Sequence, residues 1–289
     1  MTRHILGSDV YSAWAVGTLD YGSNRSGGNV FFEGRTLYSY GKHFPLGIRL
    51  PWGFLLNGDR YSATTNGHQA ATRGAAHQAA HRQGKPVLII PFSALHTLRI
   101  DPHQVVPLDI EPDREIITPC RHRNPEHPEQ HVDHLLGRSV LQVGDAYYLS
   151  GLDETARIPT DGYFLAQLPG PRNTVAGALE LLKPLVVLQA EAAGLPVKRQ
   201  GEWFFVLTTF PILNRADVSS CALLQHRDLR RTPRHRVTHL LRDTNGQQYA
   251  RGTVRHAQHE HRMLSLGNQW HSVHENTEIR SARSSGRVD

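Results

Sequence analysis

Apolar and polar residues alternate along much of the first sixty positions, with the two-residue period of a half-buried β-strand. In NVFFEGRTLYSYG, residues 29–41, the alternation continues on both sides of Glu33-Gly34, and we expect a hairpin turn there. In WGFLLNGDRYSATT, residues 52–65, Asn57-Gly58 separates two strand-like runs, and Asn-Gly is the strongest short-range signal for a hairpin. This alternation predicts an N-terminal β-meander.

The pattern changes after the meander. Residues 68–84, HQAATRGAAHQAAHRQG, are rich in alanine and glutamine, which predicts a helix that closes at Gly84. KPVLIIPF, residues 85–92, is a short apolar run suited to a buried strand. The stretch from Pro102 to Pro128 holds six prolines and many charged residues, and we expect it to be a loop.

A second group of elements follows this proline-rich stretch. NTVAGALELLKPLVVLQAEAAG predicts an amphipathic helix with Asn173 or Thr174 as its N-cap, an interruption near Pro184 and an end at Gly194. From Ala282 onward the Ser/Arg-rich tail is expected to fray. Hairpins are predicted to turn at Gly144-Asp145 and Asn245-Gly246, and further strands at residues 162–171, 201–210, 262–266 and 270–274.

These elements predict an α+β protein in which two mixed units of β-hairpins and meanders pack with a few helices. The first unit covers residues 1–118 and combines the β-meander with a helix. The second covers residues 138–281 and contains a basic segment, and residues 282–289 form a disordered tail. The break between the units is expected between residues 102 and 137, where the prolines are concentrated.

The composition is that of a globular protein, because 39% hydrophobic residues and 20% charged residues leave enough apolar side chains for a core. No run approaches the roughly 18 apolar residues that cross a bilayer. The first residues, MTRHILGSDVYSAW, lack the continuous apolar stretch of a secretory signal, so we expect a cytoplasmic protein without a membrane partner. Cys120 and Cys221 are far apart in the sequence and are expected to be reduced.

Positive charge is concentrated in the last third of the chain. Residues 196–289 hold 15 lysines and arginines against 8 acidic residues, whereas residues 1–195 hold 17 against 18. Arginine grips phosphate in a bidentate fork, and an exposed tryptophan can stack on unpaired bases, so the segment predicts nucleic acid as the partner. The alternative is a solubilising basic surface. The candidate nucleic-acid-binding residues are Arg227, Arg230, Arg231, Arg234, Arg236, Arg242 and Trp270.

Histidines near the C-terminus are candidate metal ligands. His256 and His259 are three residues apart, and His271 lies twelve residues further, beside Trp270. Three imidazoles with a carboxylate such as Glu260 would form an open site for a divalent metal cofactor. The chain has 19 histidines, so the alternative is a chance cluster without metal.

Two other patterns involve histidine. Residues 120–137, CRHRNPEHPEQHVDHLLG, predict a short helix on which His131 and His134 share a face, with His127 at its cap and Cys120 as a fourth ligand. A charged surface helix is the alternative. A Tyr-Ser pair is followed by a histidine at Ser39 with His43 and again at Ser62 with His68, but both lack a nucleophile elbow and are read as strand and turn residues. The spacing GRTLYSYGKH excludes a P-loop.

Several segments resemble a family of unknown function that is encoded in phages, plasmids and prophage regions. They are NVFFEGRTLYSYGKHFPLG, DRYSATTNGHQ, YYLSGLDE, ALELLKPLVVLQAEAAGLPVKRQGEWFFV and the closing RGTVRHAQHEH with WHSVHENTE, which together span most of the chain. One departure from the family pattern is Leu207, where a proline is expected after GEWFFV. The resemblance implies a mobile-element setting and implies no activity.

The leading hypothesis is an accessory nucleic-acid-binding protein of a mobile element, which contacts phosphates without sequence preference through the arginine segment. The first alternative is a metal-dependent nuclease or other hydrolase that uses His256, His259 and His271. The second alternative is a structural or partner-binding phage protein, in which the basic segment has no role in binding. The sequence leaves open whether the protein is an enzyme.

Overall fold

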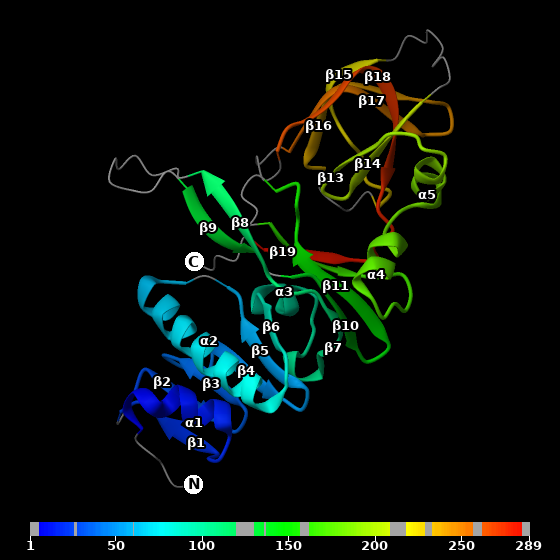
Figure 1. The fold of residues 1–289 in the computed structure, drawn as a ribbon. Helices are drawn as coiled ribbons and strands as arrows, with labels where there is room; N and C mark the ends of the chain where they lie inside the picture. Colours follow the sequence, from blue (N-terminus) through cyan, green and yellow to red (C-terminus); the bar gives the residue numbers. More distant parts are fainter. Residues whose placement is uncertain are drawn as a thin grey trace. The chain divides into compact units, whose positions relative to one another are not determined.

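The computed structural model describes residues 6–25, 28–59, 61–119, 130–135, 137–156, 162–208, 218–228, 233–256 and 262–284. The chain divides into two compact units. Unit 1 contains Met1–Ile110, Leu141–Asp145 and Ala282–Asp289, and unit 2 contains Glu111–Val140 and Ala146–Ser281. Both are rich in strands and carry a few helices, so the predicted α+β class is confirmed (Figure 1).

Unit 1 is built on a six-stranded sheet whose strands follow the chain order from β1 to β6. The first five strands form the predicted meander, and Gly34, with φ +55°, allows the tight turn between β2 and β3. The strands are β1 (Tyr21–Ser23), β2 (Val30–Glu33), β3 (Thr36–Ser39), β4 (Pro45–Leu50), β5 (Gly53–Asn57) and β6 (Val87–Ile90).

The predicted hairpin at Asn57-Gly58 is wrong. Strand β5 leads into helix α2 (Ala63–Gln83), which crosses over so that β6 pairs parallel to β5. The carboxamide of Asn57 donates to the carbonyl of Pro45 and accepts from the backbone N–H of Phe92. These long-range bonds hold Asn57 at the end of a strand instead of in a two-residue turn.

Helix α2 ends as predicted and begins earlier than predicted. Gly84 is left-handed at φ +62°, and its N–H bonds back to the last helical turn. At the other end, Ser62 accepts a hydrogen bond from the N–H of Thr65 and caps the helix. Ser62 is therefore a capping residue, where the sequence suggested a strand or turn.

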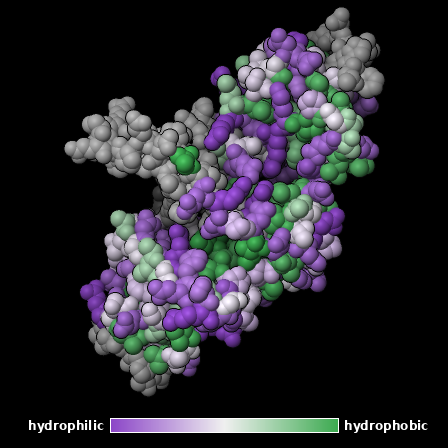
Figure 2. Space-filling view, in the orientation of Figure 1, coloured by the Kyte–Doolittle hydropathy of each residue, from purple (hydrophilic) through white to green (hydrophobic). Residues whose placement is uncertain are grey.

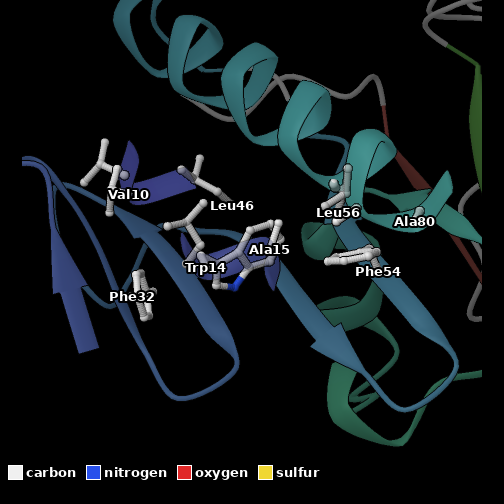
Figure 3. Close-up of a cluster of buried hydrophobic side chains, with 12 residues drawn as sticks. Val10, Trp14, Ala15, Phe32, Leu46, Phe54, Leu56 and Ala80 are labelled. Atoms are coloured by element: carbon white, nitrogen blue, oxygen red, sulfur yellow. The ribbon is translucent and has the colours of Figure 1, made fainter. Parts of the chain in front are cut away.

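Helices α1 (Val10–Val16) and α2 cover the same face of the sheet and enclose the core of unit 1 (Figure 1). Trp14 is completely buried, lies edge-on to Phe54 at 5.7 Å, and donates its indole N–H to the carbonyl of Arg35 (Figure 3). The helix side of this core is made largely of alanines, which lets α2 approach the sheet closely. The remaining helices of unit 1 are α3 (Phe92–Thr97), η1 (Gly7–Asp9) and η2 (Pro102–Gln104).

Residues 102–119, predicted to be a loop, contain the short helix η2 and two strands. Strand β7 (Val106–Ile110) belongs to a five-stranded sheet with the order β19-β12-β11-β10-β7. Its other strands are β10 (Ser139–Val143), β11 (Ala146–Leu152), β12 (Tyr163–Gln167) and β19 (Ser281–Ser284). The hairpin at Gly144 is confirmed by a φ of +56° between β10 and β11. Fraying from Ala282 is wrong for residues 282–284, because β19 includes them and Ala282 is buried.

The predicted histidine helix is also wrong. Strand β9 (Gln130–Leu135) pairs antiparallel with β8 (Arg114–Pro119), and His131 and His134 stand opposite Thr118 and Glu115. Cys120 and His127 lie outside the described residues. A cross-strand partner far along the sequence decides the conformation here, which local spacing does not reveal.

Unit 2 contains a broken helix and a second six-stranded sheet. Thr174 caps α4 (Val175–Leu181), and Pro184 separates it from α5 (Leu185–Ala192), as predicted. The sheet is antiparallel with the order β13-β14-β18-β17-β16-β15. Its strands are β13 (Val197–Gln200), β14 (Trp203–Leu207), β15 (Ser219–Leu223), β16 (His235–Arg242), β17 (Gln248–His256) and β18 (Leu264–Glu275).

This sheet has two different faces. On the inner face, Trp203 and Phe205 pack with Val237, Val254 and other apolar residues in one core cluster. On the opposite face of β14, Phe204 and Val206 pack against helix α5, so that part of the outer face is covered. Among the described residues, no helix has the length and apolar character needed to span a membrane.

Candidate functional site

Two arginines stand side by side on the outer face of the unit 2 sheet. Arg236 of β16 and Arg255 of β17 are direct cross-strand partners, and both are exposed. Their chain neighbours Val237 and Val254 pair in the same way and are buried in the inner core. Because side chains alternate between the faces of a strand, both arginines point away from the core.

A wide irregularity in β18 displays Trp270 on the same face. Ala250 pairs with His271 and Gly252 pairs with Gly267, so three residues of β18 lie opposite the single residue Arg251. Gly267 and Gly252 have φ values of +74° and +88°, a backbone shape that favours glycine. Bulges of this kind redirect a side chain that would otherwise follow the regular alternation.

Arg251 covers one face of the displayed tryptophan. Its guanidinium carbon lies 4.7 Å from the centre of the Trp270 ring, and both side chains are half-buried. This distance is within the range of a cation–π contact. The pair therefore brings an aromatic ring and a guanidinium group together on the face that carries the two exposed arginines.

A second bulge lies in the pairing of β16 with β17, between the Arg236–Arg255 pair and Arg251. Gly252 and Thr253 of β17 lie opposite the single residue Thr238 of β16, whose hydroxyl lies 2.8 Å from the hydroxyl of Thr253. A Cβ atom added at Gly252 would lie 2.7 Å from the Cβ of Thr238, which excludes a side chain at that position. Strand β17 can therefore pass Thr238 of β16 at this bulge only with glycine at position 252.

Basic residues greatly outnumber acidic residues in the strands of this sheet. Its six strands contain one acidic residue, Glu275, which is buried. They also contain Lys198, Arg199, Arg236, Arg242, Arg251 and Arg255. Hydrophilic residues are interspersed with fewer hydrophobic ones over β15 to β18 in Figure 2. We call Arg236, Arg251, Arg255 and Trp270 the arginine face.

The structure places the predicted arginines at different sites. Arg236 belongs to the arginine face, and Arg234 is exposed just before β16. Arg242 is exposed at the far end of β16, opposite Gln248. Arg227 is exposed, and its backbone N–H donates to Glu275. Arg230 and Arg231 lie outside the described residues.

Arg251 and Arg255 were not among the predicted residues. They sit four positions apart in RGTVR, with Thr253 between them, and this spacing puts all three on one face of a strand. That alternation was the available signal. Their position beside Arg236 and Trp270 depends on the register of three strands with two bulges, which the sequence does not reveal.

The predicted metal ligands are not brought together. His256 is buried opposite His235, and their ring centres are 4.9 Å apart. His271 is buried opposite Ala250, six residues along β17 from His256, which corresponds to about 20 Å along a strand. His259 lies outside the described residues. His256 and His271 therefore cannot ligate one ion, and the described residues hold no group of three or more such side chains arranged for a metal.

A cluster of buried polar side chains lies under the sheet. The Nδ1 atom of His226 lies 2.7 Å from Oε1 of Glu275, and the carboxylate accepts this hydrogen bond. Glu202 Oε1 lies 3.8 Å from Nε2 of His226 and 3.6 Å from Nδ1 of His235. All four side chains are at most 7% exposed. These buried contacts connect Glu275 at the end of β18 with Glu202 before β14 and with His226 and His235.

Histidines at the end of β18 titrate below their ordinary range. Burial, with a smaller effect of the nearby Arg227, lowers the pKa of His274 from 6.5 to about 4. Burial also lowers the pKa of His271, whose Nδ1–H donates to the carbonyl of Gln269. Both imidazoles are therefore favoured as neutral groups, and the cationic character of the outer face comes from arginine.

In unit 1 the structure pairs a serine and a histidine that the sequence assigned to different motifs. Ser39 Oγ lies 2.7 Å from Nδ1 of His68, whereas Ser62 caps α2 and the ring of His43 packs on Phe44. Burial lowers the pKa of His68. Ser39 is completely buried, so its hydroxyl is not accessible to a substrate carbonyl, and the pair joins β3 to α2 structurally.

Comparison of the chain with protein families, curated proteins and solved structures found no match. The functional interpretation therefore rests on the geometry and charge of its own residues.

Proposed function

We propose that this chain is an accessory nucleic-acid-binding protein of a mobile genetic element, and that it contacts phosphates without sequence preference through the arginine face. The observation that carries the proposal is the cross-strand pair Arg236 and Arg255 on a sheet face without acidic residues. Like charges directly opposite each other destabilise a sheet, so the pair is better explained by a polyanionic ligand than by folding. The mobile-element setting rests on the family resemblance alone.

The chemistry of the arginine face supports phosphate as the group that it binds. Guanidinium groups form two parallel hydrogen bonds with phosphate oxygens, and each neutralised phosphate releases counterions. Arg251 and Arg255 add donors along β17 at a spacing of about 13 Å, which suits an extended chain of phosphates better than a single small anion. The hydrolase alternative lacks this support, because His256 and His271 lie far apart.

The test is a salt titration of binding to a mixed-sequence oligonucleotide, measured by fluorescence anisotropy. The double variant R236A/R255A removes two contacts, and we expect the slope of log affinity against log salt to flatten by about 1.4 to 1.8. The matched control is R82A/R172A, which removes the same charge from exposed positions elsewhere. An unchanged slope in R236A/R255A, or an equal loss in the control, would contradict the proposal.

A further inference from the structure

The bulge of β18, residues 267–270, presents polar and aromatic side chains on the outer face of the sheet. It breaks the alternation of the strand and turns Trp270 toward Arg251, and its residues Asn268 and Gln269 are exposed. Maintaining this shape requires Gly267 at φ +74°, although nothing packs against that position. Packing around Gly267 therefore does not explain the bulge. What the bulge does change is the direction of Trp270 and the exposure of Asn268 and Gln269.

We infer that this bulge and Arg251 form a base-binding site that makes the protein select single-stranded over double-stranded nucleic acid. The inference rests on the proposed function and adds the class of ligand to it. An unpaired base stacks on indole rings and on guanidinium planes, and the Arg251–Trp270 pair offers both. The exposed amides of Asn268 and Gln269 can hydrogen-bond the edge of that base.

A duplex can place its phosphates on Arg236 and Arg255 but does not fit the base-binding site. Each base in a duplex is stacked on both sides, so no base face is available to the Arg251–Trp270 pair. The major groove is about 12 Å wide and admits one helix or a two-stranded ribbon. The arginine face is spread over three strands of a six-stranded sheet, and strands about 4.8 Å apart give a sheet about twice as wide as that groove.

The two parts of the arginine face then have separate roles. Arg236 and Arg255 bind the phosphates, which single strands and duplexes share. The bulge binds a base, which only a single strand exposes. Phosphate binding sets the salt dependence, and base stacking sets the preference for single strands, so the two contributions can be measured independently.

The experiment compares binding of a mixed-sequence 20-nucleotide single strand and the corresponding duplex by wild type, W270A and W270F. We expect W270A to weaken single-strand binding about 5- to 150-fold, as loss of one stacked base implies. Duplex binding should change less than about twofold, and the salt slope should stay the same. W270F should keep most of the single-strand affinity, because phenylalanine also stacks.

The control is I279A, which shortens another exposed apolar side chain of unit 2 and should affect neither ligand. Thermal melting of each variant checks that the fold persists, and W270F serves as the readout if W270A does not fold. If W270A weakens both ligands equally, or neither, while wild type still binds with a steep salt slope, the base site is refuted and phosphate binding stands. If wild type binds neither ligand at low salt, the proposed function itself fails.

Discussion

Ser39 Oγ and His68 Nδ1 are joined by a 2.7 Å hydrogen bond that bridges 29 residues of sequence. One partner ends strand β3 and the other lies in the second turn of helix α2. The bond therefore ties the meander to the helix that crosses over it, and its loss should be visible in the stability of unit 1.

Replacing Ser39 by alanine should lower the free energy of unfolding by about 1 to 2 kcal/mol, because the buried hydroxyl and its ring partner lose their bond. A double-mutant cycle of S39A and H68Q, measured by urea denaturation, should show a coupling of about 1 kcal/mol. The same cycle with S39A and H43Q should show none. Coupling to His43 instead would mean that the sequence spacing, and not the observed bond, identifies the partner.

Arg255→Thr should stabilise the protein while it weakens nucleic-acid binding. Removing one of two opposed like charges relieves a cross-strand repulsion of about 0.2 to 1 kcal/mol, and threonine is a good strand residue. Thermal melting at low salt should show a higher Tm than wild type. Adding salt should shrink the difference, since it screens the repulsion. A lower Tm at low salt would show that Arg255 makes a stabilising contact.

Stability should fall on acidification between about pH 6.5 and pH 4, in part because of His274. Its folded pKa of about 4 is below the ordinary 6.5, so unfolding takes up a proton in this window, and stability present above pH 6.5 is lost as the pH falls. His274→Gln should reduce the loss by about 1 to 2 kcal/mol, after allowance for partial solvent exposure. Asp59, whose pKa is raised by burial, acts in the opposite direction and cancels in the comparison.

The measurement is Tm against pH for wild type and H274Q, with exposed His96→Gln as the control. Parallel curves for wild type and H274Q would exclude His274 as a source of the acid sensitivity.

The turn and cap signals of the sequence were reliable where the interaction is local. Gly84 ends α2, Thr174 begins α4 and Pro184 separates α4 from α5, because each acts within a few residues of its own position. Asn57-Gly58 failed because the Asn57 side chain bonds to Phe92, 35 residues away. The histidine helix failed for the same reason, since β9 is fixed by pairing with β8.

The candidate site was predictable in part. The candidate residues chosen within the basic region 196–289 include Arg236 and Trp270, which the structure places on the outer face of one sheet, and their binding to nucleic acid stays a prediction. Arg251 and Arg255 were not predicted, because the register of β17 with β16 and β18 decides which side chains lie next to them. His256 and His271 were grouped because they are close in sequence, whereas the bulged ladder separates them.

Glu275→Ala should cost about 3 kcal/mol of stability. Its carboxylate accepts hydrogen bonds from the ring of His226 and the backbone of Arg227, and the buried ring would lose its acceptor. Glu154→Ala, which removes an exposed partner of Arg114, should cost less than about 1 kcal/mol. Guanidinium chloride denaturation of both variants checks the contrast. Equal losses would show that the buried cluster contributes no more than a surface pair.

Two glycines of α2 should respond in opposite directions to alanine. Gly74 lies inside the helix with open space around its Cβ position, so Gly74→Ala should add about 0.5 to 1 kcal/mol of stability. Gly84 has φ +62°, so Gly84→Ala should remove about 1 kcal/mol. Thermal melting distinguishes the two. A loss on Gly74→Ala would mean that the helix interior does not have the regular geometry described here.

The bulge in β18 divides this strand into two parts that differ in how many neighbouring strands pair with them. Residues 271–275 are paired with β14 on one side, and residues 271 and 272 are also paired with β17, whereas Leu264, Ser265 and Gly267 are paired with β17 alone. The backbone amides of the first part should therefore exchange with deuterium far more slowly than those of the second. Arg255 lies near the part with residues 264–267, and Trp270 directly precedes the part with residues 271–275. A strand of nucleic acid bound to both would link the two parts of β18 across residues 268–270 and restrict their movement relative to each other.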